Sequence, residues 1–184
     1  MPTIYLAGPE VFLPDAMAVM GEKRRLAAQY GFTVTGPGPD ENAVKSTAPL
    51  TAHAIYERNH KAMAASDYCL ANITPFRSIS GDVGTVYEIG FMIALGRKVW
   101  AYSNDHRPYG ARVWSDWYNE SGPQALTGKD GLAIETYGMA DNLMIDGGIA
   151  YTGGQVLWPD APVADVERDL ATYEKALQLM AHTF

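Results

Sequence analysis

The feature of this sequence that most constrains its fold is the alternation of short apolar runs with amphipathic stretches through its first half. Four β-favouring runs predict strands, at Thr3–Ala7, Phe32–Thr35, Asp67–Ile73 and Lys98–Tyr102. Three stretches with the apolar spacing of helices lie between them, at Asp15–Tyr30, Thr51–Ala65 and from Asp82 or Thr85 to Leu95. Strands that alternate with helices form a parallel sheet with right-handed crossovers. We therefore predict an α/β fold of the flavodoxin-like type, a doubly wound parallel sheet of about five strands with flanking helices, whose ligands bind beyond the carboxyl ends of the strands.

The remaining segments are less regular. A Pro/Gly cluster after the second run opens a polar loop that extends to about Pro49. Ser103–Gly131 predicts a long ordered insertion, whose aromatic residues either cover a pocket or, as we favour, pad an interface. Residues 133–146 predict a helix that ends at Gly147-Gly148, and helical spacing predicts another from Val163 to about Thr183. Since no repeat or linker interrupts the sequence, we expect a single domain over residues 1–184.

Composition excludes several classes of function. The 184 residues carry 14 Lys and Arg against 21 Asp and Glu, and this net charge of −7 argues against nucleic-acid binding, which needs a basic surface. Membrane insertion and export are not expected, because no apolar run approaches the ~20 residues of a membrane span and the N-terminus lacks a signal-like pattern. The single cysteine, Cys69, excludes an intrachain disulfide and favours a cytoplasmic location. The four histidines lack the spacing of a zinc site, so we predict neither a metal nor another cofactor.

The segment richest in chemical information runs from Asn72 to Gly96. It leads from a strand through a Pro/Ser/Gly loop into a helix where Glu88 lies among apolar residues. Burying a carboxylate without a partner is costly, so Glu88 either makes a structural contact or works in a pocket. Thr85 and Glu88 also have the spacing of a capping box, which leaves a structural and a catalytic interpretation open. Taken alone, Asp82 fits a helix N-cap and Tyr5 fits a core residue.

Three segments taken together resemble the nucleoside 2-deoxyribosyltransferase family. They are Tyr5-Leu6-Ala7-Gly8-Pro9, then Gly81-Asp82-Val83-Gly84-Thr85 followed by Glu88-Ile89-Gly90, and Asn142-Leu143-Met144. The second segment is the most specific of the three. The resemblance extends over about residues 3–102 and returns at Asn142–Ile145.

The resemblance implies a role for each matching residue. Glu88 would attack C1′ of a 2′-deoxynucleoside, Tyr5 would orient its carboxylate, and Asp82 would bind a sugar hydroxyl. The backbone of Ala7 and Gly8 and the ring of Phe12 would line the sugar and base pocket. Asn142, with Met144 nearby, would come from a neighbouring subunit of a dimer or hexamer. Asn59 stands where other members often carry an aspartate that meets the base. Because an amide cannot protonate a leaving base, Asn59 leaves base preference and the general acid open.

The implied activity is that of a nucleoside 2-deoxyribosyltransferase, which exchanges the base of 2′-deoxynucleosides with free nucleobases. The reaction would pass through a covalent deoxyribosyl–glutamate intermediate and retain the anomeric configuration. One alternative is a deoxynucleoside 5′-monophosphate N-hydrolase, for which Arg77 and Ser78 offer phosphate donors, although the residues around Asn142 favour an unphosphorylated nucleoside. A second alternative is a non-catalytic nucleotide-binding module.

Overall fold

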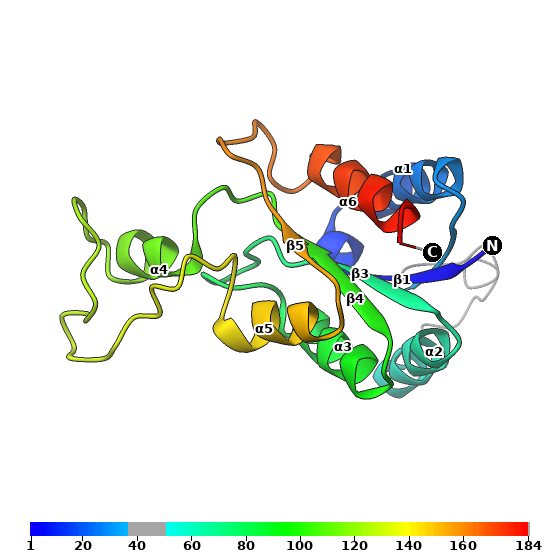
Figure 1. Cartoon of the computed structure of the whole chain (residues 1–184), viewed down its shortest axis with the longest axis horizontal. Helices are drawn as coiled ribbons and strands as arrows, with labels where there is room; N and C mark the ends of the chain where they lie inside the picture. Colours follow the sequence, from blue (N-terminus) through cyan, green and yellow to red (C-terminus); the bar gives the residue numbers. More distant parts are fainter. Residues whose placement is uncertain (37–50, 184) are drawn as a thin grey trace.

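The computed structural model describes residues 1–36 and 51–183, and its centre is a five-stranded sheet in the order β2-β1-β3-β4-β5 (Figure 1). The strands are β1 (Thr3–Ala7), β2 (Thr33–Thr35), β3 (Tyr68–Asn72), β4 (Lys98–Tyr102) and β5 (Val156–Leu157). Every neighbouring pair is parallel. This order and direction confirm the predicted flavodoxin-like α/β fold. Nearly all of the polar loop expected up to Pro49 lies outside the described residues.

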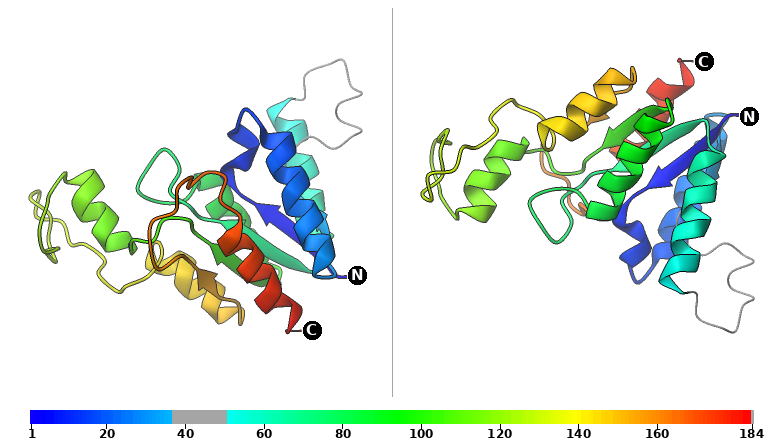
Figure 2. Two further views of the ribbon diagram at one scale, coloured as in Figure 1. Left: turned by 90° about the horizontal axis from the view of Figure 1, so that it is seen from above. Right: turned by 90° about the horizontal axis from the view of Figure 1, so that it is seen from below.

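Helices cover both faces of the sheet (Figures 1 and 2). The main helices are α1 (Ala16–Gln29), α2 (Ala52–Ala64), α3 (Val83–Ala94), α5 (Leu143–Tyr151) and α6 (Ala171–Ala181). α1 and α6 pack on one face, and α2, α3 and α5 pack on the other. A short 3-10 turn, η1 (Pro9–Phe12), joins β1 to α1. None of the helices in the described residues has the length and apolarity to cross a bilayer.

The period of two along the strands decides which side chains meet which helices. On β1, Ile4 and Leu6 enter the core beneath α1 and α6, whereas Tyr5 and Ala7 enter the core beneath α2, α3 and α5. This alternation directs the Tyr5 side chain toward α3, although β1 and α3 are far apart in sequence.

The helix predicted over residues 133–146 is wrong in its position. Residues 133–142 form a loop, and α5 begins after Asn142, whose side-chain oxygen accepts a hydrogen bond from the amide of Met144 at 3.0 Å. The helix then continues through Gly147-Gly148 to Tyr151. A side chain at Gly148 would lie against Ile93 of α3, so the glycine permits the two helices to pack closely.

The C-terminal helix is shorter than predicted. It begins only at Ala171. Asp165 accepts hydrogen bonds from the amides of Glu167 and Arg168 and holds the preceding segment in a turn, and Asp169 accepts one from the amide of Ala171, the first residue of the helix.

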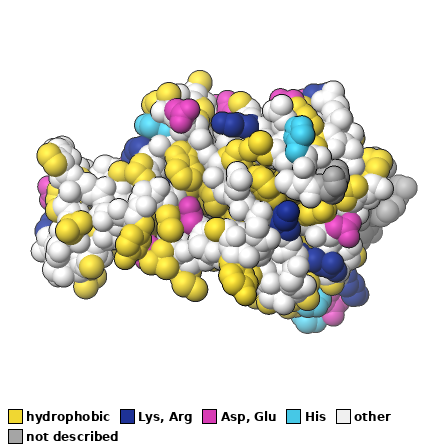
Figure 3. Space-filling view, viewed as in Figure 1, with side chains coloured by type: hydrophobic (Ala, Val, Ile, Leu, Met, Phe, Trp, Pro, Cys, Tyr) yellow, Lys and Arg dark blue, Asp and Glu magenta, His cyan; other side chains and the backbone are white. Residues whose placement is uncertain are grey.

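The insertion predicted at Ser103–Gly131 forms part of an arm that projects from the sheet on the left of Figure 1. It contains α4 (Tyr109–Arg112) and a π-helical turn, η3 (Val113–Trp117). Val113, Tyr118 and Ile134 form a small core of the arm, against which Tyr109 and Trp114 pack. Tyr109, Trp117 and Tyr118 also line a pocket, and padding of an interface by these aromatic residues stays a prediction. Apolar side chains remain on the surface of the arm (Figure 3), and the exposed ones include Trp117, Leu126, Leu132 and Tyr137.

Candidate active site

Tyr5 and Glu88 meet in the structure. The Tyr5 hydroxyl donates a hydrogen bond to Oε1 of Glu88, which joins β1 to the middle of α3. Tyr5 is fully buried and Glu88 is 9% exposed. The sequence pattern placed these two residues in one site, and the fold brings their polar atoms together.

The capping-box interpretation of Glu88 is wrong. Asp82 is the N-cap of α3, and its Oδ2 accepts hydrogen bonds from the Thr85 amide at 3.0 Å and from the Thr85 hydroxyl at 3.4 Å. Thr85 therefore lies inside the first turn, and Glu88 follows it within the helix. Oδ1 of Asp82 makes no hydrogen bond within the described part of the chain and remains available as an acceptor.

The surroundings of Glu88 bring its pKa close to neutrality. Burial raises the pKa of Glu88 to about 7, the hydrogen bond from Tyr5 opposes this rise, and the negative charge of Asp82 adds to it. Burial and the neighbouring Glu88 also raise the pKa of Tyr5, so the phenol keeps its proton and remains a donor. A carboxylate that is poorly solvated and held by one donor is well suited to attack an electrophilic carbon.

A cavity of about 340 Å³ opens beside the first residues that follow β1 and β3. Phe12 and Phe76 stack in its wall with ring centroids 5.2 Å apart, and the Arg77 guanidinium lies 4.8 Å from the Phe76 ring. Since β1 and β3 are neighbouring strands whose connections leave to opposite faces, the cavity lies at the crevice where such folds bind ligands. Phe12 lines this cavity, whereas Tyr5, Asp82 and Glu88 are not among its lining residues, so a role of Phe12 in a sugar and base pocket stays a prediction.

Gly8 lies between this cavity and β1, and a side chain there has no room. A Cβ at Gly8 would run into the Glu10 carboxylate and would lie 3.0 Å from Cβ of Asn72. The glycine therefore permits the close packing of Glu10 and Asn72 against the end of β1.

A buried polar cluster that sequence reasoning missed fixes the turn after Gly8. Oε1 of Glu10 accepts hydrogen bonds from Lys23, from Asn72 at 3.0 Å and from Tyr102 at 2.9 Å. The Lys23 ammonium also lies between two rings, 4.8 Å from that of Tyr173 and 5.4 Å from that of Tyr102. Burial would raise the pKa of Glu10, but Lys23 and the other donors lower it below the ordinary value, so the ion pair is charged. Glu10 and Lys23 offered no periodic or motif signal, because their partners lie on distant strands and helices.

None of the other predicted residues forms a hydrogen bond with Glu88 within the described part of the chain. Oδ1 of Asn59 on α2 is buried without a hydrogen-bond partner in the described structure. The Asn142 side chain, besides capping α5, donates to Glu135 at 2.7 Å, and Met144 is 73% exposed. No contact of Asn142 within the described residues reaches Tyr5, Asp82 or Glu88. The same part of the chain contains no group of three or more His, Cys, Asp or Glu residues arranged to hold a metal ion.

Comparisons with known proteins identify the family and the fold of this chain. A model of the nucleoside 2-deoxyribosyltransferase family matches residues 4–144. A solved 2-desoxiribosyltransferase from Leishmania mexicana is 28% identical with a TM-score of 0.67, over 99% of this chain and 98% of that one. A CMP N-glycosidase from Clostridium botulinum, 15% identical with a TM-score of 0.52 over 97% and 98% of the two chains, shares the fold. An uncharacterized Schizosaccharomyces pombe protein is 29% identical over 170 residues, 85% of this chain and 81% of its own length.

Proposed function

Because the chain belongs to the nucleoside 2-deoxyribosyltransferase family, we propose that it exchanges the base of 2′-deoxynucleosides through a covalent intermediate on Glu88. The observation that carries the proposal is the buried contact between the Tyr5 hydroxyl and the Glu88 carboxylate, beside the Asp82 cap of α3. A phenol that remains protonated can orient one carboxylate oxygen and leave the other free to react.

The proposed reaction consists of two displacements. In the first, an oxygen of Glu88 bonds to C1′ as the N-glycosidic bond breaks, and the base leaves with the bonding electrons. In the second, a nitrogen of an incoming base attacks C1′ and frees Glu88, so the configuration is retained. The negative carboxylate also stabilises the positive charge that develops at C1′ in both transition states.

The remaining predicted residues have substrate-binding roles in this proposal. The free Oδ1 of Asp82 accepts a hydrogen bond from the 3′-hydroxyl of the sugar, and the backbone of Ala7 and Gly8 lines the sugar pocket. The unpartnered amide oxygen of Asn59 suits an N–H group of a base. Phe12 offers an aromatic face at the crevice, against which a base can stack.

We further propose that the chain forms a dimer or hexamer in which Asn142 and Met144 complete the site of a neighbouring subunit. The ends of α3 and α5 support this proposal, because Val83 is 84% exposed, Met144 is 73% exposed and Tyr151 is 90% exposed. Exposed apolar side chains on neighbouring helices favour contact with another protein surface. Mixed oligomers of Glu88→Ala and Asn142→Ala should regain activity after subunit exchange, and a fully active Asn142→Ala would contradict the role.

The decisive experiment measures exchange between deoxyinosine or thymidine and free adenine, together with release of deoxyribose. Mass spectrometry of the protein mixed with a 2′-deoxynucleoside should find a deoxyribosyl adduct on Glu88. Glu88→Ala should abolish both signals, whereas Glu57→Gln, an exposed change on α2, should keep them. A folded Glu88→Ala protein that retains more than about a tenth of the wild-type rate, a barrier change below ~1.4 kcal/mol, would refute the proposal. Failure to detect an adduct or any base release would favour a non-catalytic nucleotide-binding module.

One observation favours hydrolysis of deoxynucleoside 5′-monophosphates as a second candidate. The Arg77 guanidinium lies over the Phe12 and Phe76 rings beside the cavity and forms no ion pair within the described residues. An unpaired guanidinium at a cavity can bind a phosphate. Comparing base release from deoxynucleosides and from their 5′-monophosphates, in wild type and in Arg77→Ala, distinguishes the two candidates.

A further inference from the structure

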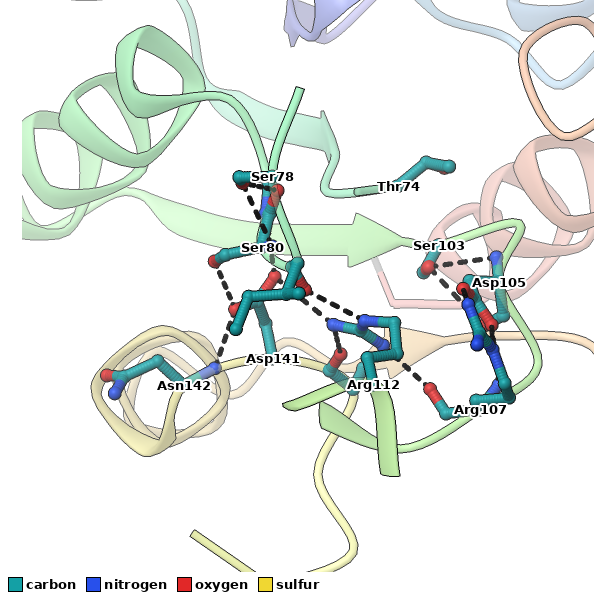
Figure 4. A network of polar contacts seen from close by, with 12 residues as sticks. Thr74, Ser78, Ser80, Ser103, Asp105, Arg107, Arg112, Asp141 and Asn142 are labelled. Carbon is teal, nitrogen blue, oxygen red and sulfur yellow. Dashed lines mark hydrogen bonds and ion pairs between the residues drawn. The ribbon is translucent and has the colours of Figure 1, made fainter. Parts of the chain in front are cut away.

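A buried ion pair joins the arm to the two helices that carry the proposed substrate-binding residues (Figure 4). Nη2 of Arg112, at the end of α4, lies 3.6 Å from Oδ2 of Asp141, and neither side chain is exposed. Asp141 immediately precedes Asn142, the cap of α5. Burying a charged pair is costly unless its remaining donors and acceptors also form hydrogen bonds. The other hydrogen bonds of Arg112 and Asp141 therefore show which segments the pair connects.

The Asp141 carboxylate binds the loop that leads into α3. It accepts hydrogen bonds from the hydroxyl of Ser80 and, at 2.9 Å, from the amide of Gly81. These two residues come directly before Asp82. The same carboxylate accepts the amide of Asn142 at 2.7 Å, while the Asn142 side chain points away from the cluster (Figure 4). One side chain thus fixes the entry to α3 against the entry to α5.

Arg112 fixes the same two segments from the side of the arm. Its Nε donates to the carbonyl of Ile79 at 2.9 Å, and its Nη2 donates to the carbonyl of Ala140 at 2.7 Å. Its Nη1 donates to the carbonyl of Arg107 at 2.7 Å. The planar guanidinium therefore connects three backbone segments in a fixed geometry, which a flexible ammonium group would not reproduce.

Asp146 of α5 also binds the backbone segment that leads into this helix. Its two oxygens accept the amides of Ala140 and Asp141, each at 3.0 Å, so the backbone that carries Asp141 is held by the helix that it precedes. Glu88, in contrast, is held by Tyr5 in the core beneath α3 and forms no hydrogen bond with these segments within the described residues.

We propose that Asp141, supported by Arg112, is a positioning residue that sets the place of Asp82 at the entry to α3. This inference rests on the proposed function, because it concerns how Asp82 meets the sugar. Asp141 does not touch the substrate and acts through Ser80 and Gly81. If the carboxylate no longer accepts both donors, the residues before Asp82 move, while Glu88 keeps its contact with Tyr5. Substrate binding through Asp82 should therefore weaken more than the chemical step.

The test is Asp141→Asn, which keeps the shape of the side chain but places an NH₂ group where an acceptor is needed. Asp130→Asn is the matched control, because Asp130 accepts a hydroxyl from Tyr118 at 2.7 Å and the amide of Leu132 at 3.0 Å within the arm. We expect Asp141→Asn to raise KM for a 2′-deoxynucleoside about tenfold, with kcat changed less than about threefold. The control should leave both values within about twofold of wild type.

A double-mutant cycle separates positioning from general damage. Because Asp141 acts through Asp82, Asp141→Asn should change KM less than about twofold when it is added to Asp82→Ala. Its effect on KM should also largely disappear with a 2′,3′-dideoxynucleoside, which lacks the hydroxyl that Asp82 binds. A full tenfold effect in either case would overturn the proposal and leave the pair as an anchor of the arm.

Two further measurements keep the inference testable if Asp141→Asn folds poorly or if the wild type exchanges no base. Ser80→Ala removes one of the two donors and should give a smaller rise in KM in the same direction. Amide hydrogen exchange at Thr85, whose N–H is bound by Asp82, needs no substrate. Faster exchange at Thr85 in Ser80→Ala, but not in Asp130→Asn, supports positioning even where the proposed reaction fails. Unchanged exchange at Thr85 in Ser80→Ala contradicts it.

Discussion

Replacing Glu88 by glutamine should stabilise the protein, and the gain should depend on pH. Burial raises the pKa of Glu88 to about 7, against an ordinary value of 4.5. The unfolded chain therefore releases this proton at a lower pH than the folded chain. Below pH 4.5 the side chain is neutral in both states and costs nothing. As the pH rises to 7 and above, the folded state loses stability, because it must hold a buried charge.

The size of the effect follows from the two pKa values. Each unit of difference corresponds to about 1.4 kcal/mol, so the charged Glu88 should cost about 3 kcal/mol of unfolding free energy above pH 7. Glutamine stays neutral and can still accept the hydrogen bond from Tyr5. Glu88→Gln should therefore match the wild type near pH 4 and exceed it by about 3 kcal/mol at pH 8, roughly 6–12 °C in melting temperature.

Urea unfolding of both proteins at pH 4, 6 and 8, followed by circular dichroism, measures this difference. Glu57→Gln, whose side chain is exposed on α2, controls for the loss of one negative charge and should show no comparable rise with pH. A difference between Glu88→Gln and wild type that is the same at pH 4 and pH 8 would refute the reasoning. A confirmed gain would mean that this site keeps a destabilising charge for the sake of reactivity.

Three further predictions concern the site and its supports. The rate of base exchange should rise with pH through about 7 as Glu88 ionises. The midpoint of the pH–rate profile should shift down in Asp82→Asn and up in Tyr5→Phe, and an unchanged midpoint in both variants would contradict the described electrostatics. Lys23→Met leaves the buried Glu10 without its cation and should lower the unfolding free energy, measured by urea titration, by about 3–5 kcal/mol. A loss below about 1 kcal/mol would mean that water reaches the ion pair. Gly154→Ala should lower the melting temperature, because the new methyl group would meet the Val99 carbonyl on β4. Gly147→Ala in α5 has open space and should raise the unfolding free energy by about 1 kcal/mol, and with it the melting temperature. The reverse order of melting temperatures would contradict the packing around β4.

The first half of the fold could be predicted because its signals are local. Each strand there is an apolar run between turn residues, and α2 and α3 begin at side chains, Thr51 and Asp82, that cap them. The contact of Tyr5 with Glu88 was implied by the family resemblance alone, and the structure shows how the alternation of side chains along β1 directs Tyr5 toward α3.

The rest depends on contacts between residues far apart in the sequence. The helix predicted over residues 133–146 began too early, because Arg112 and Asp146 bind the backbone of the loop before α5. β5 is only two residues long, so no periodic pattern could reveal it. Glu10 and Lys23 look like surface residues until the fold places Asn72, Tyr102 and Tyr173 around them.

The two outer strands of the sheet have a consequence for behaviour at high concentration. β2 has three residues and β5 has two, whereas the inner strands have five each. A strand at the edge of a sheet can pair with the backbone of another molecule, and short edges limit the number of hydrogen bonds such pairing can form. Sheet-to-sheet growth, the usual route to fibrous aggregates, is therefore disfavoured. The short edges leave helices and exposed side chains as the larger surfaces through which copies of this chain can make contact.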